Sequence, residues 1–80
     1  MPTVLRREGF RFAFFSDEGS PREPPHAHVS GGGNEAKIWL EPDIAVAENY
    51  GFNARELNRL VRIVREERQR FLRAWHEHFR

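Results

Sequence analysis

The chain has 80 residues, of which 39% are hydrophobic and 31% are charged, and its formal net charge is +1. This length fits one small domain with one hydrophobic core, and the composition is too apolar for a disordered tail. The sequence has no cysteine, which excludes a disulfide scaffold, a thiolate metal site and a cysteine nucleophile. Because the first residues show no signal-peptide pattern and no run approaches the roughly 18 apolar residues of a membrane span, we expect a cytoplasmic protein with no membrane partner.

Charge is spread unevenly along the sequence. Residues 1–52 carry five basic and eight acidic side chains, or −3, whereas residues 53–80 carry eight basic and four acidic side chains, or +4. This asymmetry predicts either an acidic partner for the basic half or contact between the two halves. All of the basic residues except Lys37 are arginine, whose planar guanidinium group suits phosphate and carboxylate.

The first half of the sequence predicts strands, because aromatic and other apolar residues alternate with polar ones between turn signals. The clearest alternation places apolar residues at every second position from Ala36 to Leu40. Glu8-Gly9 and the glycines at 31–33 are typical of hairpin turns. Residues 17–25, which include three prolines, predict an exposed loop, and residues 44–50 fit either a short strand or a helical turn. The predicted strands cover residues 3–7, 10–16, 26–30 and 35–41.

One long helix is predicted over residues 54–79. Asn53 followed by Glu56 matches a capping box, and no glycine or proline occurs from Ala54 onward. An amphipathic helix and an amphipathic sheet can each bury an apolar face on the other. We therefore expect a single α+β domain over residues 1–80, in which a mostly antiparallel sheet of about four strands packs in two layers against the helix. The sheet residues expected in the core are Phe12, Phe14, Val29, Ile38 and Leu40.

Several short motifs occur in an order that resembles the domain of unknown function 4160 family of small prokaryotic proteins. They are PTVL at 2–5, GFRF at 9–12, PPHAHV at 24–29, AKIWLEP at 36–42, FNAREL at 52–57 and AWH at 74–76. The resemblance covers essentially the whole chain. It implies a component of a small two-gene, toxin–antitoxin-like cassette, and it implies no reaction and no catalytic residue.

His26 and His28 are the first candidate functional residues. Residues two apart in a strand point to the same side, so both imidazoles are expected within reach of one ligand. A histidine pair can act as general acid and general base in RNA cleavage, with Lys37 or an arginine stabilising the phosphorane. The same geometry suits a divalent metal with a third ligand from His78 or Glu41. Alternatively, the two histidines have a purely structural role and only form hydrogen bonds with the neighbouring loop and the sheet edge.

The sheet face away from the helix is the second candidate. Cations that alternate with aromatic residues on an open sheet can stack unpaired bases, so this face predicts nucleic-acid binding. The alternative to nucleic-acid binding is that residues 44–50 or a second chain cover Trp39. The residues expected on this face are Arg11, Phe15, His26, His28, Lys37, Trp39 and Glu41.

A row of arginines on the polar face of the predicted helix is the third candidate. This row fits a phosphate backbone or an acidic partner, and its members are Arg55, Arg59, Arg62, Arg73 and Arg80. Such a row also fits a solvated helix face with local ion pairs.

The functional hypothesis is a small toxin–antitoxin-like module that binds or acts on RNA or another nucleic acid through His26 and His28. Arg11, Lys37, Trp39 and the helix arginines are the expected contacts. The first alternative is a non-enzymatic interaction module that binds the product of a neighbouring gene, or a second copy as a homodimer, through the open sheet face. The second alternative is a divalent metal site at His26 and His28. No other cofactor is expected.

Overall fold

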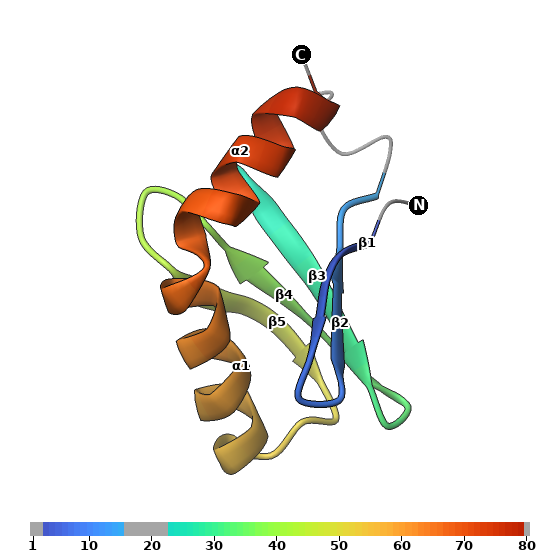
Figure 1. Ribbon diagram of the computed structural model, residues 1–80. Coiled ribbons are helices and arrows are strands. Elements are labelled where there is room, and N and C mark those ends of the chain that lie inside the picture. Colours follow the sequence, from blue (N-terminus) through green and yellow to red (C-terminus); the bar gives the residue numbers. More distant parts are fainter. Residues whose placement is uncertain (1–2, 16–22, 80) are drawn as a thin grey trace.

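The structure of the protein, a computed structural model, describes residues 3–15 and 23–79. Within these residues, five antiparallel strands follow one another in the order of the sequence, and two helices cover one face of the sheet (Figure 1). The elements are β1 (Thr3–Arg7), β2 (Phe10–Ala13), β3 (His26–Gly31), β4 (Asn34–Trp39), β5 (Ala45–Tyr50), α1 (Ala54–Glu66) and α2 (Arg68–His78). The predicted α+β class and the two layers are therefore confirmed.

The hairpin turns follow from residues that accept positive φ. Glu8 and Gly9 have φ angles of 54° and 84°, and Gly32 and Gly33 have 57° and 84°. Two consecutive residues in this region form the two-residue turn whose twist matches paired strands. The Glu8 carboxylate also receives two hydrogen bonds from Arg62 on α1, at 3.0 and 3.2 Å. The first hairpin tip is thereby held against the helix layer.

The sequence prediction of four strands was wrong by one, because residues 44–50 contain β5. Strand β5 pairs with β4 at the edge of the sheet, with an irregularity between Lys37 and Ile38. Its side chains are mostly exposed, so it lacks the alternation that identifies a half-buried strand. This strand extends the sheet by one edge strand and adds mostly exposed side chains to it.

The predicted strand 10–16 ends earlier, at Ala13. Phe14 leaves the strand ladder and packs against Trp75, with ring centroids 5.2 Å apart. Phe15 stacks on the ring of His28 instead of pairing along the strand. Ser16, and the part of the predicted loop from 17 to 22, lie outside the described residues.

The single predicted helix is two helices that meet at Glu67. The predicted capping box is confirmed, since Asn53 Oδ1 accepts from the Glu56 amide at 2.8 Å and Glu56 Oε1 accepts from the Asn53 amide at 2.9 Å. The backbone of Glu67 has φ −107° and ψ 18°, outside helical geometry. Its carboxylate binds Arg7 of β1 at 3.1 Å and Arg70 at 3.0 Å. The break therefore coincides with an ion-pair link from the helices to the sheet.

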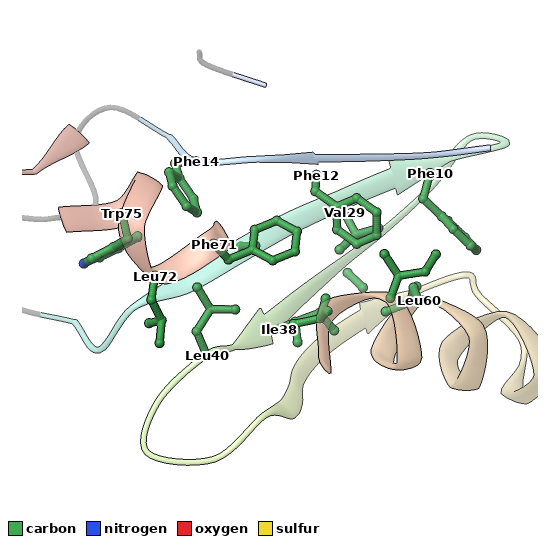
Figure 2. Packing of buried hydrophobic residues seen from close by; sticks show 14 of the residues in the cluster. Phe10, Phe12, Phe14, Val29, Ile38, Leu40, Leu60, Phe71, Leu72 and Trp75 are labelled. Carbon is green, nitrogen blue, oxygen red and sulfur yellow. The ribbon is translucent and has the colours of Figure 1, made fainter. Parts of the chain in front are cut away.

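The core lies between the sheet and the helices. Phe71 of α2 reaches toward Phe12 and Val29 of the sheet (Figure 2), and the Phe12 and Phe71 ring centroids are 5.5 Å apart. Burying a side chain of this size contributes roughly 1.5–3 kcal/mol. The five core residues expected from the sequence are all buried. The buried residues that form this core are Phe10, Phe12, Phe14, Ala27, Val29, Ala36, Ile38, Leu40, Phe52, Leu60, Ile63, Val64, Phe71, Leu72 and Trp75.

Candidate functional site

The sheet face opposite the helices carries a row of polar side chains across three neighbouring strands. His28 of β3 pairs with Lys37 of β4, and Lys37 pairs with Glu48 of β5. Because Ala27, Val29, Ala36 and Ile38 point into the core, strand alternation places these neighbours on the open face. The row therefore brings an imidazole, an ammonium group and a carboxylate to one surface.

His26 does not have the accessible position that the sequence predicted. Its side chain is fully buried, and its ring lies 5.5 Å from the Trp39 ring and 5.1 Å from the Trp75 ring, centroid to centroid. Its Nδ1 is 2.9 Å from the carbonyl oxygen of Pro24. Since a carbonyl oxygen only accepts, Nδ1 carries the proton. His26 is therefore held as a packed histidine that fixes the entry to β3.

His28 is half-buried and borders the open face. Its ring stacks on Phe15 with centroids 3.9 Å apart, and its centroid is 5.3 Å from that of His26. The predicted proximity of the two imidazoles is confirmed, but the two rings have different surroundings. His28 is the histidine of this pair that lines a surface pocket.

That pocket is a hollow of about 180 Å³ over β3, β4 and β5. The side chains from the row form much of its wall, and Tyr50, which is 64% exposed, stands at its β5 side. The Tyr50 hydroxyl donates to Glu48 Oε1 at 3.3 Å. The residues that line this pocket are Phe15, His28, Glu35, Ala36, Lys37, Glu48 and Tyr50.

Lys37 is already paired with an anion from the protein itself. Its Nζ lies 2.7 Å from Oε1 of Glu23 and 4.6 Å from the centroid of the Trp39 ring. The hydrogen bond from Lys37 holds the pKa of the Glu23 carboxyl below its usual value, and the charges of Lys37, His26 and His28 act in the same direction. Lys37 is therefore the cation in direct contact with this carboxylate.

The other expected contacts of the open face have different surroundings. Trp39 is half-buried between His26 and Lys37 and is not the exposed stacking surface that the sequence suggested. Arg11 pairs with Ser30 and donates from Nε to the Thr3 hydroxyl at 2.8 Å, beyond the pocket. Tyr50 is the most exposed aromatic residue of the described part of this face.

Two of the predicted helix arginines take part in ion pairs. Arg62 binds Glu8 and also lies 3.6 Å from Glu66, and Arg59 lies 3.9 Å from Glu8. Arg55 is exposed on the first turn of α1. All of these arginines belong to the helix layer, on the other side of the sheet from His28. The structure does not bring the helix row and the histidine pocket together.

A second hollow, of about 270 Å³, lies where β4 ends and β5 begins. Trp39 and Pro42 form apolar parts of its wall, close to Pro24. Glu41, expected on the open face, borders this hollow and not the histidine pocket. The full lining is Pro24, Trp39, Glu41, Pro42, Asp43 and Ala45.

The metal alternative requires a third ligand beside the two histidines. Among residues 3–15 and 23–79, no group of three or more histidine, aspartate or glutamate side chains is placed to hold a metal ion. His78 is exposed at the end of α2, where its ring contacts Phe79 at 4.5 Å. In the same described segments, no helix is long and apolar enough to cross a bilayer.

Glu23, Glu48 and Tyr50 were not identified from the sequence as site residues. Glu23 lies in a proline-rich segment with no periodic pattern, and Glu48 and Tyr50 belong to the strand that lacks clear alternation. One sequence pattern could have linked Glu48 and Tyr50. They are two residues apart, so both side chains point to the same face of the sheet if residues 44–50 form a strand.

Comparison with known proteins gives a family assignment. No curated protein and no solved structure matches the chain. A family model with the description "Domain of unknown function (DUF4160)" matches residues 9–76. This match includes β2 to β5, α1 and most of α2, and therefore the whole His28 pocket. The chain belongs to the DUF4160 family.

Proposed function

We propose that the protein is a small toxin–antitoxin-like module that binds RNA through the open sheet face, with His28 and Lys37 contacting phosphate. The observation that carries the proposal is the position of Glu23. Its carboxylate Oε1 lies 2.7 Å from Lys37 Nζ, and Lys37 is the group that most strongly favours a negative charge at this position. A phosphate group has the charge and the acceptor oxygens to replace this carboxylate.

The aromatic residues around the centre support RNA as the ligand. Single-stranded RNA exposes unstacked bases, which proteins bind by stacking on aromatic side chains. Tyr50 presents an exposed ring at the pocket, and Phe15 with His28 forms a stacked pair at the opposite wall. One nucleotide would be bound by both residues, because Lys37 would contact its phosphate and the Tyr50 ring would stack on its base.

The proposal that the protein is one component of a two-gene cassette comes from the family resemblance. It suggests a cellular role for RNA binding. In a toxin–antitoxin-like pair, a protein that engages RNA would inhibit growth, and its partner would oppose that effect. Expression of the chain alone, and together with its neighbouring gene, tests this part. Inhibition that His28→Gln removes supports it, whereas equal inhibition by the variant contradicts it.

RNA binding is tested by fluorescence anisotropy with a short labelled single-stranded oligouridylate. Lys37→Gln is expected to weaken binding and to reduce the slope of log affinity against log salt by about 0.7, the value for one phosphate contact on a single strand. Arg73→Gln removes one exposed positive charge from α2 and is the matched control. Equal loss in both variants, or no binding by the unmodified protein, would contradict the proposal.

A protein partner is the second candidate, and the apolar hollow beside Trp39 and Pro42 favours it. Val46, 40% exposed, adds apolar surface on β5. The partner would be a second copy or the product of the neighbouring gene. Light scattering measures assembly, and Trp75→Phe leaves Trp39 as the remaining tryptophan for fluorescence. A complex that shifts Trp39 emission favours this candidate, and a monomer in both samples contradicts it.

A further inference from the structure

The row on the open face contains the three groups that RNA cleavage requires. We propose that His28, Lys37 and Glu48 form an RNA-cleaving centre, in which Glu48 is the general base and His28 the general acid. This inference rests on the proposed binding of RNA to the same face. It replaces the pair of histidines expected from the sequence, because His26 is fully buried and bonded to Pro24.

The strand register gives the row a suitable spacing. Neighbouring strands are about 4.8 Å apart, so β3 and β5 are separated by about 10 Å, with β4 between them. His28 and Glu48 therefore stand on either side of Lys37, around the hollow of about 180 Å³. In-line displacement at phosphorus needs the base and the acid on opposite sides and a cation near the equatorial oxygens.

The chemistry uses only the RNA and these side chains. Glu48 takes the proton from a ribose 2′-hydroxyl, and the 2′-oxygen forms a bond to the adjacent phosphorus. The bond from phosphorus to the 5′-oxygen breaks, and protonated His28 gives its proton to that oxygen. Lys37 stabilises the added negative charge of the phosphorane. The products are a 2′,3′-cyclic phosphate and a 5′-hydroxyl end, and solvent restores both side chains.

Two neighbouring aromatic residues position the acid and the base. The Tyr50 hydroxyl binds Glu48 at 3.3 Å, and the Phe15 ring stacks on His28 at 3.9 Å. Glu35 also borders the pocket, but it pairs with Ser30 and Tyr50 in the next row of the sheet. The register therefore favours Glu48 over Glu35 as the base. Lys37 reaches the phosphate by exchanging its Glu23 partner for it.

The experiment incubates the purified full chain with a labelled single-stranded oligouridylate and analyses the products and the binding in parallel. Cleavage is expected to yield 2′,3′-cyclic phosphate ends, and DNA or 2′-O-methyl RNA of the same sequence should bind without being cleaved. Glu48→Gln and His28→Gln should each lower the cleavage rate by about 100-fold or more. Glu77→Gln, on the exposed end of α2, makes the same charge change as a matched control.

The outcomes separate this inference from the proposed function. Binding of RNA without cleavage, or cleavage that Glu48→Gln leaves at the wild-type rate, overturns the cleaving centre and leaves the binding proposal standing. Failure of the unmodified protein to bind any of the three oligonucleotides overturns both. Circular dichroism tests whether each variant keeps the fold, which is expected for Glu48→Gln because Glu48 is exposed. Retained RNA binding by Glu48→Gln would likewise show that a loss of cleavage is not a loss of folding.

Discussion

The carboxylate of Glu23 and the ammonium group of Lys37 lie 2.7 Å apart, although 14 residues separate them in the sequence. This ion pair joins the segment before β3 to the centre of β4. It puts a negative group of the protein next to Lys37, where the proposed function places an RNA phosphate. The pair is thus both a structural link and a competitor for the ligand.

Removal of this competitor should strengthen RNA binding. Glu23→Gln is expected to raise the affinity for single-stranded oligouridylate by no more than about fivefold, since an exposed ion pair is a weak competitor that solvent and salt screen. Anisotropy titration at low salt measures the change. Glu77→Gln, which adds the same net charge on α2, is the control. An equal gain in the control would show that only net charge matters.

The titration of Glu23 provides a pH-dependent test. The hydrogen bond from Lys37 lowers the pKa of Glu23 in the folded protein, so the pair stabilises the fold above the pKa of the unfolded chain. This contribution is lost as the pH falls through the lowered pKa. An NMR titration of the Glu23 carboxyl should show its midpoint rising in Lys37→Gln. An unchanged midpoint would contradict the ion pair.

The two histidines should differ in their effect on stability. His26→Ala is expected to lower the free energy of unfolding by about 2–4 kcal/mol, because it leaves a cavity between two tryptophans and an unpaired Pro24 carbonyl. His28→Ala should cost less, about 1–2 kcal/mol, because the ring is half-buried and its loss removes contacts with Phe15 and His26 without opening a cavity in the core. Urea unfolding measures both. Similar values for the two variants would contradict the burial of His26.

The capping box of α1 predicts a local effect with a matched control. Asn53→Ala should lower the free energy of unfolding by about 1 kcal/mol, because the Glu56 amide loses its acceptor. Asn58→Ala makes the same substitution at an exposed position inside α1 and should be neutral or slightly stabilising, since alanine favours helix. Thermal unfolding of both variants measures the difference, and equal destabilisation would contradict the assigned cap.

The fold was predictable from the sequence where local patterns and burial agree. The alternation from Ala36 to Leu40 and the capping box at Asn53 each depend on a few adjacent residues. The three apolar positions are buried and the cap is present, although the strand predicted over 35–41 spans Asn34–Trp39 and ends before Leu40. Strand β5 was ambiguous because its exposed side chains show no apolar period. The helix break at Glu67 has no glycine or proline to mark it, and it coincides with an ion pair to Arg7, 60 residues away.

The candidate site was predictable only in part. The spacing of His26 and His28 correctly placed the two imidazoles together, because strand geometry alone determines it. The burial of His26 depends on Trp75 of α2, which no local pattern connects to β3. Glu48 enters the site through the pairing of β5 with β4, so its position required knowledge of the fifth strand.

The most direct test of RNA binding at the open face is an amide NMR titration of the isotope-labelled protein with single-stranded oligouridylate. The largest shift changes are predicted at His28, Lys37 and Tyr50, on three neighbouring strands. Changes concentrated at Arg55 and Arg59 of α1 would place the ligand on the opposite layer and contradict the account, as would the absence of any change at saturating oligonucleotide.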